Sequence, residues 1–337
     1  VATGYDIGTP APLGSTDLNK LRAGAVDAVF FAAYVPKRYA ASGSAAYCRR
    51  IIDAIRNGIV ARHPSEFVLA RTADDIVSAS KQGKIAALIG IEGGHAIEDS
   101  LDKLREYHAL GVRYMTLTHS NTNNWADSSG DKPRHGGLSQ FGEQVVAEMN
   151  RLGMVVDVSH VSDETFDDVM RTSKAPVIAS HSSCRAISRS RRNMTDDMLR
   201  KLAKNGGVIQ INFACDFLNE RSRTTNQTAK KALQRRFGDN LDALRAESEK
   251  RFARASLADV IAHIDHAVKV AGIDHVGIGS DFDGIDCTPI GLEDNSKFPA
   301  LTQRLLQRGY TADQIHKIYG GNTLRVMRAT ENMARVR

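Results

Sequence analysis

The stretch KIAALIGIE, residues 84–92, decides the fold of this chain. It is a short apolar run that ends on one carboxylate, Glu92. Such a run is typical of a parallel strand that is buried on both faces. Six further apolar runs also end on a polar residue; they are AVDAVFFAAY (25–34), VRYMTLTH (112–119), MVVDVSH (154–160), APVIASH (175–181), GGVIQIN (206–212) and DHVGIGSD (274–281).

Amphipathic segments alternate with these runs, and several of them stop at a glycine. This helix–glycine–strand order predicts an α/β protein built as a (β/α)8 TIM barrel. Seven strands are found where eight are needed, so we expect the first strand to lie upstream of Val1. We interpret residues 1–337 as a single domain. The expected helices cover residues 47–61, 72–82, 100–110, 141–152, 162–172, 195–205 and 257–271.

Composition excludes several classes of protein. No run of about 18 apolar residues is present, so no membrane-spanning helix is expected. The net charge is +6, but residues 220–254 carry ten Lys or Arg and five Asp or Glu, which is +5 of it. The basic character is therefore local, belongs to a charged helical excursion over about 218–256, and does not indicate nucleic-acid binding. We expect a cytoplasmic protein, or a periplasmic or secreted one if a signal peptide precedes Val1.

The four cysteines are Cys48, Cys184, Cys215 and Cys287. They are widely spaced and form no CxxC motif. This pattern suggests neither a zinc ribbon nor a disulfide framework. We therefore predict buried or free thiols.

Three strand ends carry residues that bind metals. In a parallel barrel all strand carboxyl ends open at one mouth, so residues distant in sequence converge there. Glu92, His160 and His181 each end such a strand. A buried carboxylate must be paired or metal-bound, and imidazole suits zinc. The sequence thus predicts a metal-dependent hydrolase with these three residues as ligands. His95, in GIEGGH, is the competing ligand candidate, but it lies past the strand end and a structural hydrogen-bonding role is favoured for it.

Three further residues are candidates for catalysis and substrate binding. Asp281, in GSDFDG, is taken as the catalytic carboxylate, and its neighbour Asp283 as a turn former. His119, in TLTHS, is either a third imidazole ligand or a group that faces the substrate. Arg192, in SRSRRN, has the planar fork that binds a substrate carboxylate, although a solvated basic loop is an equal alternative. The HxD at His263 lies within a predicted helix, where residues two apart do not face each other, and is rejected as a ligand pair.

The chain resembles the membrane dipeptidase (renal dipeptidase) family of the amidohydrolase superfamily, as a soluble, bacterial-type member. The resemblance covers nearly the whole chain. Its most specific stretch is IGIEGGHAIEDSLDKLREYHALGVRYMTLTHSNTNNWADS, and the others are DVSHVSDET, PVIASHSSCRAISRSRRNMTDDML, HVGIGSDFDG and YGGNTLRVM. The family's lipid-anchor tail is missing.

This resemblance implies a barrel with two zinc ions. It implies that Glu92 bridges both ions and that His160 and His181 bind the second one. It also implies that His119 contacts the substrate carbonyl and catalyses with Asp281, which handles the proton, and that Arg192 holds the terminal carboxylate. The family's first-strand HxD, which binds the first ion, is absent from this sequence and is expected about ten residues before Val1.

We therefore expect a zinc-dependent dipeptidase for dipeptides with a free C-terminal carboxylate, among them dipeptides with a D-residue at the C-terminal position. The enzymatic alternative is another amidohydrolase reaction, on a β-lactam or an N-acyl amino acid. The non-enzymatic alternative is a metal-free binding barrel, if the HxD is truly absent. We expect a small-molecule dipeptide substrate as the partner, with neither nucleic acid nor membrane, and a homodimer is the candidate assembly.

Overall fold

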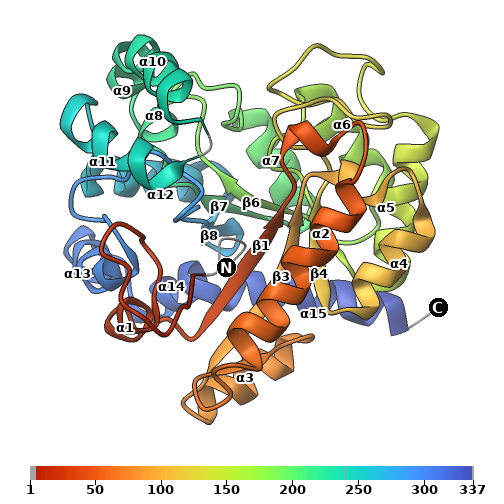
Figure 1. The fold of residues 1–337 in the computed structure, drawn as a ribbon, viewed down its shortest axis with the longest axis horizontal. Coiled ribbons are helices and arrows are strands. Elements are labelled where there is room, and N and C mark those ends of the chain that lie inside the picture. The colour runs from red at the N-terminus through yellow and green to blue at the C-terminus, as the bar shows by residue number, and fades with distance from the viewer. Residues whose placement is uncertain (1–4, 239, 336–337) are drawn as a thin grey trace.

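A computed structural model describes residues 5–238 and 240–335. All seven predicted runs contain a strand, and an eighth, short strand that was not predicted lies beside them (Figure 1). The strands are β1 (Ala28–Tyr34), β2 (Phe67–Leu69), β3 (Ile85–Glu92), β4 (Val112–Thr116), β5 (Val155–Asp157), β6 (Ile178–Ser182), β7 (Val208–Ile211) and β8 (Val276–Ile278).

The strands form one parallel sheet in the order β1-β3-β4-β5-β6-β7-β8, with β2 paired to the start of β3. Strand β3 is buried along nearly its whole length. Its register with β1 runs from Ala28 opposite Ala86 to Tyr34 opposite Glu92. The sheet curls as a TIM-barrel sheet does, which confirms the predicted fold class. Among the described residues it does not close, because β1 and β8 are not paired with each other.

Helices surround the sheet, as the alternating pattern predicts (Figure 1). The seven expected ones are α2 (Ser44–Asp53, extended by a π-helical stretch Ala54–Val60), α3 (Ala73–Lys81), α4 (Leu101–Ala109), α5 (Gln140–Leu152), α6 (Asp163–Thr172), α7 (Asp196–Asn205) and α12 (Leu257–Ala271). The remaining ones are α1 (Leu18–Ala23), α8 (Cys215–Leu218), α9 (Glu220–Thr225), α10 (Gln227–Phe237), α11 (Leu241–Arg251), α13 (Phe298–Arg308), α14 (Ala312–His316) and α15 (Asn322–Arg335).

Local capping explains where these helices begin and end. The Thr195 side chain accepts a hydrogen bond from the Met198 amide at the start of α7, and the helix stops at Gly206, whose φ is 84°. Helix α5 repeats this design with Ser139 and Gly153. A polar N-cap satisfies a free amide of the first turn, and glycine adopts the left-handed conformation of a helix end at little cost. Gly153 and Gly206 lie just before the starts of β5 and β7, so the chain passes directly from each helix into the next strand.

Helices α9, α10 and α11 form the charged excursion that the sequence places after β7. They lie together with α8 at one end of the molecule, beside α12 (Figure 1). No helix in the described part of the chain is both long and apolar enough to cross a membrane.

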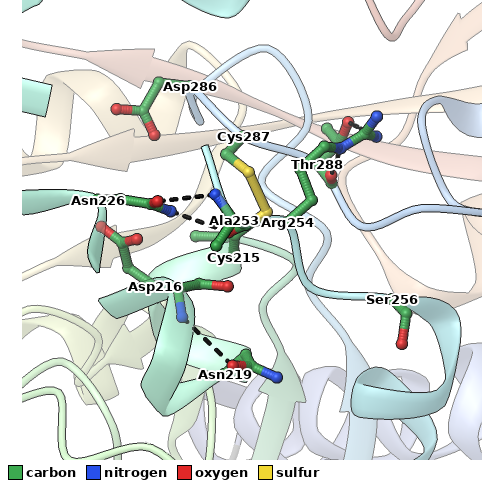
Figure 2. Close-up of a disulfide and its surroundings, with 12 residues drawn as sticks. Cys215, Asp216, Asn219, Asn226, Ala253, Arg254, Ser256, Asp286, Cys287 and Thr288 are labelled. Carbon is green, nitrogen blue, oxygen red and sulfur yellow. Dashed lines mark hydrogen bonds between the residues drawn. A yellow bond between two sulfur atoms is a disulfide. The ribbon is translucent and has the colours of Figure 1, made fainter. Parts of the chain in front are cut away.

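The prediction for the cysteines was wrong in part. Cys215 and Cys287 form a disulfide across a sequence separation of 72 residues (Figure 2). Spacing could not reveal it, because the two cysteines meet only when the segments after β7 and β8 come together. Cys48 and Cys184 are buried free thiols, as expected.

Candidate metal centre and active site

Three predicted ligands converge at the carboxyl ends of β3, β5 and β6. Glu92 Oε1 lies 3.0 Å from His160 Nε2 and 3.2 Å from His181 Nε2. The two imidazole Nε2 atoms are 2.8 Å apart. Among the described residues this is the one group of three or more His, Cys, Asp or Glu whose ligand atoms lie within 4.8 Å of one another. One carboxylate oxygen and two imidazole nitrogens are a donor set that fits zinc.

A second layer of residues fixes the orientation of His181. Its Nδ1 is 2.7 Å from the Ser180 hydroxyl, which also donates to Asp157 Oδ2 at 2.6 Å. With Nδ1 held, Nε2 points toward Glu92. Such partners orient a metal-binding imidazole and tune its basicity. Sequence reasoning missed Asp157 and Ser180, although both lie within the DVSH and IASH runs.

His119 lies beside the cluster but farther from its carboxylate. Its Nε2 is 3.8 Å from Glu92 Oε1, and its ring centroid is 4.4 Å from that of His160 and 4.7 Å from that of Tyr34. Burial lowers the pKa of His119 to about 4, so its imidazole is neutral at pH 7. A neutral ring that carries one proton can donate a hydrogen bond to a substrate oxygen.

Arg192 faces the same cavity from the loop after β6. Its Nη2 donates to the carbonyl oxygen of His181 at 3.0 Å, and its guanidinium lies 5.4 Å from the Phe217 ring centroid. Its Nε is buried and has no hydrogen-bond partner among the described residues. Burial lowers the pKa of Arg192 to about 10, which still leaves it charged at pH 7. Donor capacity therefore remains for an anionic group of a ligand.

The structure separates the two aspartates of DFDG. Asn212 Nδ2 donates to Asp281 Oδ2 at 3.0 Å, whereas Asp283 Oδ1 accepts a hydrogen bond from the amide of Ser15. Burial raises the pKa of Asp281, a direction that suits a group that takes up and returns a proton. Asn212 was recognised only as a polar strand end; its contact with Asp281 depends on the pairing of β7 with β8.

All six predicted site residues line one cavity of about 2630 Å³. They are Glu92, His119, His160, His181, Arg192 and Asp281. The cavity is larger than a dipeptide needs, because it continues between β1 and β8, where Phe30 and Ile278 line it. His263 lies elsewhere: its two ring nitrogens contact the Cys184 amide and the Leu218 carbonyl at 2.9 and 3.0 Å, so neither is available to a metal.

Residues 4–337 match the membrane dipeptidase family, peptidase family M19. The chain belongs to this family. Its members are metal-dependent hydrolases of peptide bonds, in agreement with the convergence of Glu92, His160 and His181 at the strand ends.

Relatives of this M19 chain occur in fungi and bacteria. It is 39% identical over 333 residues to the dipeptidase verJ of Clonostachys rogersoniana, covering 96% of this chain and 77% of the relative. The identity is also 39%, over 334 residues, to an uncharacterised dipeptidase of Schizosaccharomyces pombe, covering 95% of this chain and 73% of the relative.

Two solved structures share the fold of this membrane dipeptidase family member. One is the probable dipeptidase PvdM of Pseudomonas aeruginosa, with a TM-score of 0.86, 29% identity, and coverage of 98% of this chain and 92% of that one. The other is a metallopeptidase of Rhodobacter sphaeroides bound to a phosphinate mimic of L-Ala-D-Ala, with a TM-score of 0.80, 28% identity, and coverage of 98% and 93%.

Proposed function

We propose that this protein is a zinc-dependent dipeptidase that acts on dipeptides with a free C-terminal carboxylate. The observation that carries the proposal is the placement of Arg192 and Asp281 in the same cavity as Glu92, His160 and His181. A site with a metal-binding end and a guanidinium fits a substrate whose scissile amide lies one residue from a carboxylate.

Glu92, His160 and His181 are the residues that hold zinc in this proposal. Bound zinc supplies Lewis-acid polarisation of a carbonyl and lowers the pKa of water. The resemblance implies a second ion, whose expected HxD ligands are not among the described residues. We therefore propose two ions for a chain that carries the HxD and one for residues 1–337.

The other residues of the site bind the substrate, stabilise the developing charge and transfer the proton. Arg192 binds the terminal carboxylate and sets the register of the dipeptide. His119 donates a hydrogen bond to the carbonyl oxygen as negative charge develops on it, an effect worth roughly 3–4 kcal/mol in comparable sites. Asp281 takes a proton from the attacking water and delivers it to the leaving amine. Asn212 holds Asp281 in the orientation that this transfer needs.

The test is hydrolysis of L-Ala-D-Ala and L-Ala-L-Ala by the zinc-loaded protein. We expect turnover of dipeptides that is lost with a chelator and regained with zinc. The phosphinate mimic bound by the Rhodobacter sphaeroides enzyme supports acceptance of a D-residue. Faster hydrolysis of an N-acyl amino acid or a β-lactam than of either dipeptide would favour the alternative amidohydrolase reaction. Absence of both zinc binding and hydrolysis would favour a non-catalytic barrel.

The disulfide indicates the kind of cellular compartment in which the protein resides. Disulfides persist in oxidising environments and are rare in cytosolic proteins. The Cys215–Cys287 bond therefore favours a periplasmic or secreted location over the cytoplasm. Fractionation of cells that express the natural gene tests this assignment.

A further inference from the structure

The segments that follow β7 and β8 run side by side and are joined at both ends. At the strand end, Asn212 Nδ2 donates to Asp281 Oδ2 at 3.0 Å. Farther along, the amide of Cys215 donates to the carbonyl oxygen of Cys287 at 3.3 Å, and the two cysteines form the disulfide (Figure 2). The loop 279–287 is thus held at one end by its strand and at the other by the disulfide.

The backbone of this loop adopts a conformation that needs support. Asp281 and Asp283 have φ values of 60° and 66°, in the left-handed region that non-glycine residues rarely adopt. Such residues keep this conformation only where the surrounding structure imposes it. Because Asp281 lies six positions before Cys287 in the sequence, the disulfide is one of the constraints on its backbone.

An ion pair reinforces the same junction. Lys230, from α10, lies 2.9 Å from Asp286 Oδ2 and 3.3 Å from Asp216 Oδ2. Each aspartate is the sequence neighbour of one cysteine, and both lie next to the disulfide in Figure 2. The disulfide, its flanking aspartates and Lys230 therefore attach α10 of the charged excursion to the loop that carries Asp281.

We propose that the Cys215–Cys287 disulfide is a positioning tie for Asp281, so that full dipeptide turnover requires this cysteine pair to be oxidised. The inference rests on the proposed role of Asp281. A catalytic group displaced by about 1 Å loses much of its effect on rate. The three metal-binding residues lie on or just after other strands, and Arg192 is held by its hydrogen bond to the His181 carbonyl oxygen as well as by its contact with Phe217. Loss of the tie therefore affects turnover far more than substrate binding or metal content.

Reduction of the tie follows ordinary thiol–disulfide exchange. A dithiol such as dithiothreitol attacks one sulfur, the Cys215–Cys287 bond breaks, and a mixed disulfide forms. The second thiol of the reagent then attacks its own sulfur in this mixed disulfide and releases the cysteine as a thiol. Two electrons and two protons pass to the cysteines, which become thiols, while the reagent becomes a cyclic disulfide. Cys215 and Cys287 are buried, with 1% and 2% of their surface exposed. The reagent therefore reaches the disulfide only when the protein opens locally around it.

The experiment compares a Cys215→Ala/Cys287→Ala double variant with a matched Cys48→Ala/Cys184→Ala variant. The control removes two buried free thiols and keeps the disulfide. We expect the first variant to lose at least tenfold in kcat, with KM within twofold and zinc content unchanged. We expect the control to keep kcat within twofold. A kcat equal to that of the unmodified enzyme, or a loss of thermal stability alone, would overturn the proposal.

A second measurement is independent of catalysis. Amide hydrogen exchange over residues 279–287 should be faster in the unmodified protein after reduction with dithiothreitol than before it. If this exchange is unchanged, the tie does not position the loop and the proposal is wrong, whatever the activity. If the unmodified protein hydrolyses no dipeptide while exchange still accelerates, the proposed function fails and the mechanical tie stands. Four free thiols in the unfolded, unreduced protein would show that the disulfide does not form.

Discussion

The Nε2 atoms of His160 and His181 lie 2.8 Å apart, although His160 follows β5 and His181 lies near the end of β6. Both face Glu92 Oε1, at 3.0 and 3.2 Å. Two imidazole nitrogens and a carboxylate oxygen do not gather this closely in a core without a cation or shared protons between them. We therefore expect the protein to bind zinc at this point.

Loss of one ligand should remove this ion. His181→Ala should abolish stoichiometric zinc, and Ser180→Ala, which removes only the partner of His181 Nδ1, should weaken zinc binding about ten- to a hundredfold. Metal analysis and competition with a chelator measure both effects. His316→Ala, at an exposed histidine on α14, is the matched control and should bind zinc normally. Equal zinc content in all three variants would contradict the site.

The two aspartates of DFDG should differ in function. Asp281→Asn should keep the fold and zinc but lose on the order of a hundredfold or more in kcat, as expected for a general acid–base group. Asp283→Asn should keep most of kcat and lose about 1 kcal/mol of stability, because it weakens the hydrogen bond from the Ser15 amide. The reverse pattern would assign the proton transfer to Asp283.

Arg192 should discriminate between acids and amides. Arg192→Ala should lower kcat/KM for dipeptides at least about thirtyfold, since it removes a charged partner worth roughly 2–5 kcal/mol. Dipeptide amides should be poor substrates of the unmodified enzyme and nearly indifferent to the substitution. Arg192→Lys tests the planar fork, which lysine lacks. Equal losses for acid and amide would mean that Arg192 only shapes the loop.

For the charged excursion, a solvated helical hairpin or an oligomer contact is the simpler hypothesis, and long-range attraction of acidic dipeptides is the one to test. Gln234 of α10 lines the cavity, and Arg235 and Arg236, which follow it, are exposed. If they attract acidic dipeptides, the preference for an acidic over a neutral dipeptide should fall as salt rises, since the Debye length is about 8 Å at physiological ionic strength. The same preference for the acidic dipeptide should also be smaller in the Arg235→Glu/Arg236→Glu double variant. If the ratio of kcat/KM for the acidic dipeptide to kcat/KM for the neutral one changes with neither salt nor charge reversal, the excursion does not select substrates and is a solvated hairpin or an oligomer contact.

Stability should depend on pH through His263. Burial lowers the pKa of His263 to about 4, below the 6.5 that is ordinary for a histidine. In the unfolded chain His263 is protonated below about pH 6.5, whereas in the folded protein it is protonated only below about pH 4. The free energy of unfolding should therefore fall across this window, by on the order of 3 kcal/mol. His263→Gln cannot titrate, so it should be less stable at pH 8 but show a flatter decline. Parallel pH profiles for the two proteins would contradict this.

The sequence determined the strands and the three candidate metal ligands. Each strand is a contiguous apolar run, and Glu92, His160 and His181 are placed by the rule that parallel strands share one carboxyl end. The short strand β2 escaped prediction, because three residues paired to the start of β3 carry no periodic signal. The proposed roles of His119 and Arg192 came from the motifs of the membrane dipeptidase family, since a lone histidine after a strand or a lone arginine in a loop has several ordinary explanations.

Only the tertiary structure decided which residues meet across strands. The Asn212–Asp281 hydrogen bond, the Asp157–Ser180–His181 chain and the Cys215–Cys287 disulfide all join segments distant in sequence. The presence of a strand is encoded locally in its apolar run, whereas a contact between two strand ends depends on the order of pairing and on the register of the curled sheet. Those are properties of the assembled sheet, because they arise from packing many runs together at once.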